Sequence, residues 1–193
     1  MRAPADPRVR AAFAAVDRRR FLTRAQGRRA QVDRPIPIGW GQTNSQPSTV
    51  ADMLDLLAVA PGHRVLDVGT GSGWTTGLLA HLVGAAGRVV GVELVPELAA
   101  WGAGHLEALG MPWATIEAAD PAVLGKPADG PYDRILVSAG AEAVPTTLID
   151  QLVVGGRLVV PVSGEMLVVD RTDAGPTATR HGRYSFVPLI VPR

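Results

Sequence analysis

The sequence predicts an α/β fold in which a mostly parallel, doubly wound sheet carries helices on both faces and ends in an antiparallel C-terminal edge. Short, valine-rich apolar runs, typical of buried parallel strands, alternate with stretches that carry apolar residues at helical spacing. A length of 193 residues with 47% hydrophobic residues suits a domain large enough to bury a core. We therefore expect a single domain over residues 1–193.

Two helices are expected ahead of the sheet, because apolar residues recur there at helical spacing. The apolar face of the first helix consists of Val9, Ala12, Phe13 and Val16. The second begins at Pro47, a residue suited to the first helical turn, and ends at Pro61 and Gly62. Between them lies an arginine cluster that we interpret as a solvated helix face: Arg18, Arg19, Arg20, Arg24, Arg28 and Arg29.

The alternation of strands and helices then follows in order. We expect strands at residues 64–68, 89–94, 114–118, 133–138, 157–162 and 166–170. Helices are expected at residues 74–83 and 97–109 and after Pro145. A last strand is predicted at residues 184–190, where Pro188 favours a sheet edge or a bulge.

The first predicted strand of the sheet runs into a glycine-rich loop. Gly69, Gly71 and Gly73 alternate behind Asp67, and glycines let a backbone turn sharply and approach a ligand. A dinucleotide site would carry a third close-packing glycine at the sixth loop position, where this chain has Trp74. The loop therefore suits a nucleoside cofactor without a pyrophosphate.

The next predicted strand ends in Glu93, at a place where an acid can accept both ribose hydroxyls. A glycine loop and a ribose-binding acid, without a pyrophosphate site, favour S-adenosylmethionine as the cofactor. A plain turn could also explain the loop, and a solvated carboxylate could explain Glu93. The spacing between the two makes the functional interpretation the better one.

Composition excludes several other functions. With a net charge of +1 the chain carries no strong nucleic-acid signature, and it has no cysteine for disulfides, thiolate catalysis or cysteine zinc sites. The four histidines are scattered, so we expect no metal. No apolar run approaches the about 18 residues of a membrane span, and Asp6, Arg8 and Arg10 argue against a signal peptide. We expect a cytoplasmic protein without a membrane or nucleic-acid partner.

The polar segment at residues 35–47 precedes the glycine loop and concentrates hydroxyl and amide groups. Ser45 has no histidine or acid near it in sequence, so it suits the orientation of a substrate better than nucleophilic attack. Alternatively, Ser45 or Gln46 caps the helix that Pro47 opens. The pattern leaves both roles open.

At these residues the chain resembles the protein-L-isoaspartate O-methyltransferases. Members carry a Pro-x-Pro-Ile-Gly-x-Gly-Gln-Thr-x-Ser-x-Pro segment, found here at residues 35–47, followed by a strand and loop like residues 65–73. Further matches follow in the same order at residues 89–93, 96–98, 131–133, 155–162 and 186–189. The resemblance covers nearly the whole chain and implies a Rossmann-like methyltransferase sheet, with substrate-side residues at 1–46 and a cofactor-binding core at 47–193.

The resemblance implies methyl transfer from S-adenosylmethionine, with S-adenosylhomocysteine as product, to the α-carboxylate of an L-isoaspartyl residue in a damaged protein or peptide. The methyl ester collapses to a succinimide, whose hydrolysis restores aspartate. Ser45 would hold the acceptor carboxylate. The cofactor would be bound by Thr43, Asn44, Gln46, Asp67, Gly69, Thr70, Gly71, Ser72, Gly73, Glu93, Leu94 and Asp120. We expect a monomer.

The chain departs from the family pattern at several positions. Trp40 stands where histidine or another aromatic residue is more common, and Asn44 replaces a common isoleucine, so we expect a bulkier and more polar substrate mouth. Pro121 replaces the glycine that usually follows Asp120 and removes a backbone N–H near the adenine, which predicts a lower cofactor affinity. A glutamine common after the Gly-Gly strand is also missing near Glu165 and Met166.

Other functions fit the same fold, because function depends on the site. One is methylation of an aspartate in a dedicated natural-product peptide. Methylation of RNA or of a small molecule is a second, although the residues after the fourth strand, 138–141, differ from the proline-rich acidic or amide motif that a nucleobase amine would need. A third is a binding protein that keeps the cofactor fold without catalysis.

Overall fold

The computed structural model describes residues 4–191. Residues 1–3 and 192–193, which belong to the predicted domain, lie outside the described residues, and the single domain stays a prediction. The helices are α1 (Pro7–Ala15), α2 (Pro47–Leu57), α3 (Trp74–Val83), α4 (Pro96–Glu107) and α5 (Thr146–Ile149), with short 3-10 turns η1 (Arg18–Phe21), η2 (Gln26–Arg29) and η3 (Pro127–Asp129). Among the described residues, none of these helices has the length and apolarity to cross a membrane.

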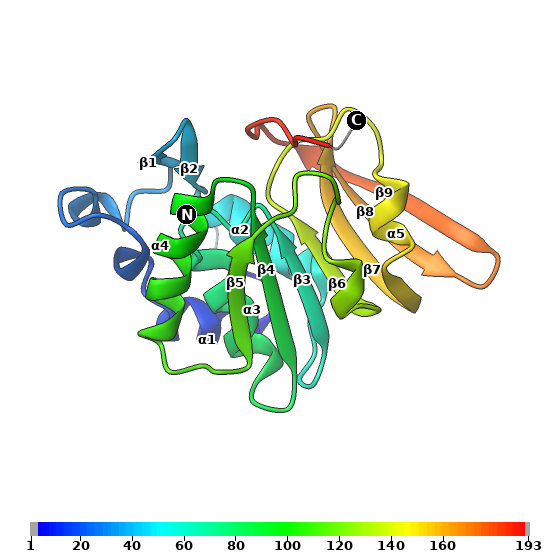
Figure 1. The fold of residues 1–193 in the computed structure, drawn as a ribbon, viewed down its shortest axis with the longest axis horizontal. Coiled ribbons are helices and arrows are strands. Elements are labelled where there is room, and N and C mark those ends of the chain that lie inside the picture. The colour runs from blue at the N-terminus through cyan, green and yellow to red at the C-terminus, as the bar shows by residue number, and fades with distance from the viewer. Residues whose placement is uncertain (1–3, 192–193) are drawn as a thin grey trace.

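Seven strands form one mixed sheet in the order β5-β4-β3-β6-β7-β8-β9 (Figure 1). They are β3 (Arg64–Val68), β4 (Arg88–Glu93), β5 (Ala114–Ala118), β6 (Tyr132–Val137), β7 (Leu152–Val162), β8 (Glu165–Thr172) and β9 (Gly175–Arg183). The pairs from β5 to β7 are parallel, and β8 and β9 are antiparallel additions. The predicted α/β sheet with an antiparallel C-terminal edge is confirmed.

Apolar residues cover both faces of the sheet. Successive residues of β3 point to opposite faces, so that Val65 packs with residues from α1 to α4, and Leu66 packs with Leu148 and Ile149 of α5. Burial on both faces explains why the parallel strands are continuous apolar runs in the sequence. The doubly wound arrangement leaves the carboxyl ends of β3, β4 and β6 free at one edge.

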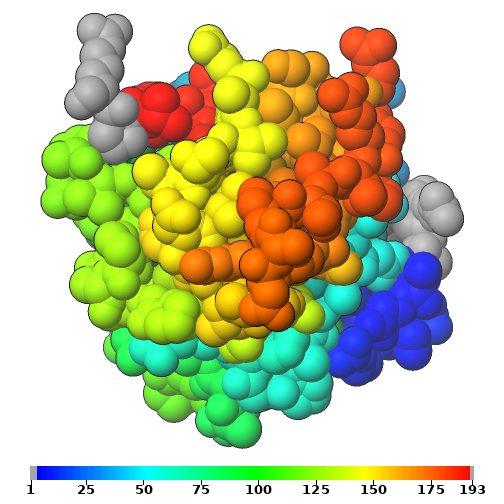
Figure 2. Space-filling model, turned by 90° about the vertical axis from the view of Figure 1, so that its right-hand side faces the viewer, coloured from blue at the N-terminus to red at the C-terminus, as the bar shows by residue number. Residues whose placement is uncertain are grey.

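The last strand differs from its prediction. The strand expected at residues 184–190 is wrong: the chain there is irregular, apart from a single bridge between Pro188 and Gly140. The true last strand, β9, lies earlier and pairs with β8; this hairpin lies, in orange, across the face shown in Figure 2. Most β9 side chains are exposed, so the strand carries no apolar pattern in the sequence.

Two helix ends also differ from their predictions. The helix that Pro47 opens ends at Leu57, because Ala58 adopts a left-handed conformation (φ 51°) before Pro61 is reached. The helix predicted at residues 97–109 is α4, which ends at Glu107, and the helix predicted after Pro145 is the four-residue α5. A short antiparallel hairpin, β1 (Ile36–Gly39) and β2 (Gln42–Asn44), lies inside the polar segment and was not predicted. In Figure 1 this hairpin and the C-terminal tail both lie at the upper end of the sheet.

Candidate active site

A pocket of about 740 Å³ lies at the carboxyl ends of the parallel strands, the usual ligand position in an open α/β sheet. Its walls come from the polar segment, the glycine loop, the end of β4, the residues after β5 and the C-terminal tail. The predicted site residues among its lining are Thr43, Asn44, Ser45, Gln46, Gly69, Thr70, Gly71, Ser72, Glu93, Leu94 and Asp120. Asp67 and Gly73 do not line it.

The glycine loop is a tight turn between β3 and α3. Gly69, Gly71 and Gly73 all have positive φ angles (79°, 55° and 92°), which side chains other than glycine rarely adopt. The N–H of Gly69 donates to the carbonyl of Val92 on β4 at 2.8 Å. The loop therefore needs its glycines for conformation as well as for a close approach to a ligand.

Glu93 connects the end of β4 to the glycine loop. Its Oε2 accepts a hydrogen bond from the N–H of Gly71 at 2.9 Å, and its Oε1 accepts one from the N–H of Val95 at 3.1 Å. The side chain is only 7% exposed but lines the pocket. Because each carboxylate oxygen can accept two hydrogen bonds, Glu93 can still accept from two hydroxyl groups of a ligand.

Asp67 lies beneath the loop and is fully buried. Its Oδ2 accepts a hydrogen bond from Thr76 of α3 at 2.7 Å, while its Oδ1 has no partner among the described residues. Burial raises the pKa of Asp67 to about 7; the Thr76 hydrogen bond opposes this shift, and the charge of Glu93 adds to it. Asp67 is thus placed to fasten the loop to α3 and not to touch a ligand.

Two glycines outside the loop allow neighbouring elements to approach it. A Cβ atom on Gly102 of α4 would lie 3.0 Å from the carbonyl oxygen of Gly71 and 3.3 Å from the carbonyl carbon of Ser72. A Cβ atom on Gly91 of β4 would lie 2.6 Å from Cγ2 of Thr70. Neither residue was predicted from the sequence, although a glycine in the middle of a helix is a usable signal of close packing.

The polar segment forms the β1–β2 hairpin and then leads into α2. Neither Ser45 nor Gln46 makes a side-chain cap for this helix; the carboxylate of Asp33 accepts the N–H of Ser48 at 2.9 Å instead. Burial would raise the pKa of Asp33, but the hydrogen bonds from Ser48 and Gln46 outweigh it and lower the pKa. Within the described residues the Ser45 hydroxyl has no hydrogen-bond partner, so it is available to a ligand in the pocket.

Arg18 corrects the interpretation of the arginine cluster as a solvated face. Its side chain is buried, and its guanidinium donates to the carbonyls of Asn44 and Ser45, among other oxygens. The other members of the cluster are exposed, as predicted. The expected helix face is absent, because this part of the chain forms the 3-10 turns η1 and η2. The sequence predicted an exposed Arg18, because an arginine is rarely buried unless its donors are satisfied, and its acceptors are visible only in the fold.

The C-terminal tail forms the wall opposite the glycine loop. The N–H of Gly140 donates to Val187 and the N–H of Leu189 donates back to Gly140, both at 2.8 Å. The hydroxyl of Tyr184 donates to the Asp52 carboxylate on α2 at 2.9 Å. The sequence analysis did not predict that these residues line the pocket, because they are far from the loop in sequence.

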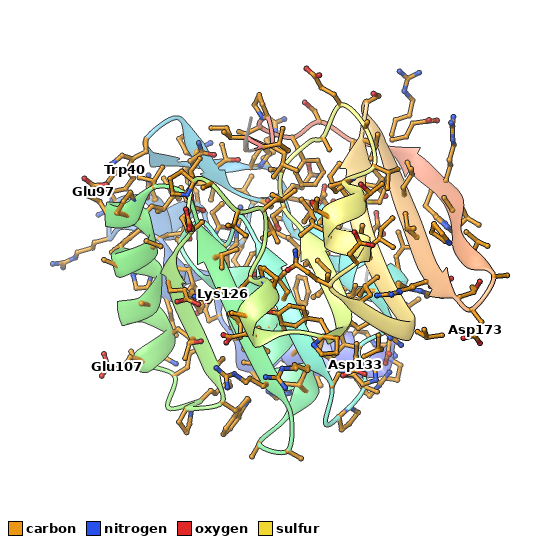
Figure 3. The ribbon with its side chains drawn as sticks, turned by 45° about the vertical axis from the view of Figure 1, so that its right-hand side comes forward. Trp40, Glu97, Glu107, Lys126, Asp133 and Asp173 are labelled. Atoms are coloured by element: carbon orange, nitrogen blue, oxygen red, sulfur yellow. The ribbon has the colours of Figure 1, made fainter. Side chains whose placement is uncertain are left out.

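Two of the departures noted above lie in different places. Trp40 is at the tip of the β1–β2 hairpin, 51% exposed and outside the pocket lining, so the bulkier mouth stays a prediction (Figure 3). Pro121 does line the pocket beside Asp120. One oxygen of Asp120 accepts the N–H of Ala122 at 2.9 Å, and this hydrogen bond orients the side chain.

Comparison with known proteins agrees with this architecture. The profile of the family described as Protein-L-isoaspartate(D-aspartate) O-methyltransferase (PCMT) matches residues 2–192. A protein-L-isoaspartate O-methyltransferase from Methanopyrus kandleri is 44% identical over 95% of this chain and 83% of its own, and one from Anaeromyxobacter dehalogenans is 51% identical over 81% and 74%.

A solved structure is also similar. It is a Plasmodium falciparum protein described as a protein-L-isoaspartate O-methyltransferase, in complex with S-adenosyl-L-homocysteine, with a TM-score of 0.81 and 25% identity over 96% of this chain and 91% of that one. The chain therefore belongs to the protein-L-isoaspartate O-methyltransferase family, with the fold of S-adenosylmethionine-dependent methyltransferases.

Proposed function

We propose that this protein transfers a methyl group from S-adenosylmethionine to the α-carboxylate of L-isoaspartyl residues in damaged proteins or peptides. The observation that carries the proposal is the pocket itself, which is lined both by a glycine loop anchored to an acid and by Ser45, whose hydroxyl has no hydrogen-bond partner among the described residues. Family membership at 44% identity over most of the chain supports the same activity.

The residues of the pocket fit this cofactor. Gly69, Gly71 and Thr70 would face its methionine part, and the buried Oγ1 of Thr70, which has no partner among the described residues, offers a hydrogen bond. Glu93 would accept the ribose hydroxyls, and the second oxygen of Asp120 would accept the adenine amino group. The acids of the pocket also favour a positively charged sulfonium.

The remaining cofactor-side residues have supporting roles in this proposal. Ser72 and Leu94 line the pocket beside the loop and the ribose acid, and Thr43, Asn44 and Gln46 line the junction between cofactor and acceptor. Asp67 and Gly73 would act indirectly, by shaping the loop. Pro121 offers no N–H to the adenine, so we still expect a reduced cofactor affinity.

The reaction needs alignment more than proton transfer. The bound sulfonium supplies an electrophilic methyl group and a neutral leaving sulfide. An acceptor carboxylate with a pKa of about 4 is already ionised at neutral pH, so no general base is required. Ser45 would donate a hydrogen bond to one carboxylate oxygen and thereby direct the other toward the methyl carbon, in line with the departing sulfur. As the oxygen–carbon bond forms, the carbon–sulfur bond breaks and its electron pair stays on sulfur.

The product ester explains how methylation can serve repair. An ester carbonyl is attacked far more readily than a carboxylate, so a neighbouring backbone nitrogen can close a succinimide with loss of methanol, and hydrolysis of the succinimide can then give aspartate. Only the first step needs this protein. We place it in the cytoplasm as a monomer, and size-exclusion chromatography with light scattering tests the monomer.

The direct test uses radiolabelled S-adenosylmethionine and a pair of peptides that differ only in an L-isoaspartyl or a normal aspartyl residue. We expect label on the isoaspartyl peptide alone. Ser45→Ala should lower kcat about 10-fold to 100-fold, the value of a hydrogen bond to a charged group, with little change in S-adenosylhomocysteine affinity. Equal labelling of both peptides would contradict the proposed acceptor.

Two other outcomes would redirect the assignment. Labelling of neither peptide, with cofactor binding intact, would favour a dedicated peptide or a small-molecule acceptor. An unchanged kcat in Ser45→Ala would contradict the orienting role of this hydroxyl while leaving the activity itself in place.

A further inference from the structure

Arg18 is a buried cation that precedes the polar segment in sequence and packs against it. Only 4% of the residue is exposed, and its guanidinium donates to six oxygens that come from two stretches of chain, residues 30–34 and 44–45. These are the carbonyls of Ala30, Val32, Arg34, Asn44 and Ser45 and the side-chain oxygen of Asn44. The hydrogen bond to the carbonyl of Ser45 therefore fixes the backbone of this residue.

The burial of this charge is costly. Burial lowers the pKa of Arg18 to about 10, and the attraction of Asp33 offsets this only in part. Among the described residues no carboxylate forms a salt bridge with Arg18, so neutral oxygens compensate for its lost hydration. The planar fork of the guanidinium suits several fixed acceptors at once, which a lysine could not match.

Asn44 extends this network to the cofactor loop. Its Oδ1 accepts from Nε of Arg18 at 2.6 Å, and its Nδ2 donates to the hydroxyl of Ser72 at 3.1 Å. The residue is 5% exposed, so both hydrogen bonds are shielded from water. Because Arg18 can only donate, it fixes which end of the amide faces it and turns the NH₂ group toward Ser72.

A second contact joins the same arginine to the far end of the loop. The guanidinium carbon lies 5.3 Å from the ring centre of Trp74, the first residue of α3, and the Trp74 indole N–H donates to the carbonyl of Val16 at 3.1 Å. Arg18 thus touches both the segment that carries Ser45 and the helix that follows Gly73. Movement of either side would disturb the other.

We propose that Asn44 is a positioning residue that couples the glycine loop to the polar segment. Cofactor binding orders the glycine loop, and through Asn44 this raises the affinity of the polar segment for the acceptor peptide. Arg18 anchors Asn44, and the amide of Asn44 carries the coupling to Ser72. An isoleucine at this position could form neither hydrogen bond. The proposal rests on the proposed function, because it needs both ligands to bind in this pocket.

The coupling can be measured without catalysis. We would determine the dissociation constant of an L-isoaspartyl peptide by calorimetry in the absence and presence of saturating S-adenosylhomocysteine. The wild-type protein should show a ratio of about 10, within the usual range for coupled sites. In Asn44→Ile and in Ser72→Ala this ratio should fall to about 1 to 2, and the double variant should show no further loss.

Controls separate coupling from general damage. Trp40→Asn lies on the same hairpin but is exposed and outside the pocket lining, so its ratio should equal that of the wild type. Thermal melts report whether each variant folds. A purely structural role for Asn44 would weaken peptide binding equally with and without S-adenosylhomocysteine, and an unchanged ratio in Asn44→Ile would overturn the proposal.

The peptide-labelling assay keeps the two proposals apart. A wild-type ratio of 1 together with isoaspartyl methylation would overturn the coupling and leave the proposed function intact. Absence of isoaspartyl methylation would instead contradict the function on which the coupling depends.

Discussion

The glycine loop and the polar segment lie on adjoining walls of one pocket, yet they are held in place by different means. The loop is held by backbone N–H groups and by glycines packed against β4 and α4. The segment is held by side chains, above all Arg18, which bonds to the carbonyl of Ser45, 27 residues away, and Asp33, which bonds to Ser48 at the start of α2, 15 residues away. The loop should therefore be sensitive to added atoms, whereas the segment should be sensitive to lost hydrogen bonds.

The largest expected effect concerns Glu93, the side chain that accepts a backbone N–H of the loop itself. Glu93→Ala leaves the N–H groups of Gly71 and Val95 without their acceptor, and an unsatisfied buried donor costs about 1 to 3 kcal/mol. We expect S-adenosylhomocysteine affinity to fall about 100-fold in calorimetry, with a smaller change in kcat at saturating cofactor. Glu97→Ala, at the exposed start of α4, is the control; a loss below threefold in Glu93→Ala would remove Glu93 from the site.

The second prediction concerns pH and the underside of the loop. In the native protein Asp67 keeps its proton up to a pKa of about 7, whereas in the unfolded chain it loses the proton near 3.8. Because the native state then binds more protons, this residue's contribution to stability is complete below pH 3.8 and is lost as the pH rises toward 7.

The Asp67 contribution can be isolated by substitution. Because of Asp67, the free energy of unfolding should fall by about 2 kcal/mol between pH 5 and pH 7. Asp67→Asn, measured by urea denaturation at both pH values, should be less pH-dependent by this amount. Equal pH dependence in the variant and the wild type would show that the carboxyl group is ionised in the folded protein.

A matched pair of glycines on α4 tests the sensitivity of the loop to added atoms. The Cβ atom of Gly102→Ala would press on the rigid backbone of Gly71 and Ser72, so we expect about a 10-fold loss of S-adenosylhomocysteine affinity. Gly104→Ala meets no atom within 4 Å and should be neutral or stabilise the helix by up to about 1 kcal/mol. Similar affinities in the two variants would refute close packing as the basis of the loop.

The smallest expected effect extends the comparison to the C-terminal tail. Tyr184→Phe removes the hydroxyl that donates to Asp52 and keeps the ring. Since backbone hydrogen bonds to Gly140 still hold the tail, we expect the KM of an isoaspartyl peptide to rise only about threefold, with cofactor affinity unchanged. A rise in the dissociation constant of S-adenosylhomocysteine without a change in peptide KM would assign the tail to the cofactor side.

Most of the sheet could be predicted from the sequence, because strands buried on both faces must be apolar throughout. The strands predicted at residues 64–68 and 114–118 match β3 and β5 in full. Polar strands could not be found this way: β9 owes its conformation to hydrogen bonds with β8, and the exposed side chains leave no pattern. The tail at residues 184–190 was wrongly predicted as the last strand, because it is apolar although it does not pair as a strand.

The candidate site was predictable to a different extent on its two sides. The loop and Glu93 follow from short motifs at the ends of adjacent parallel strands, which necessarily meet at one edge of the sheet. Arg18 could not be recognised, since an arginine in a basic cluster is usually solvated and nothing local shows that carbonyls will surround it. The cap of α2 by Asp33 could not be recognised either, because the carboxylate lies 15 residues before the N–H group that it accepts.

The sheet class, the glycine loop, an acid at the end of β4 and the family could all be read from the sequence, because each depends on residues that are close in sequence or on buried periodicity. Only the fold shows which residues support the loop and the segment: Gly102, Asp67, Arg18 and Asn44. The physical reason is that close packing and buried hydrogen bonds are satisfied by any residues that the fold brings together, whatever their separation along the chain.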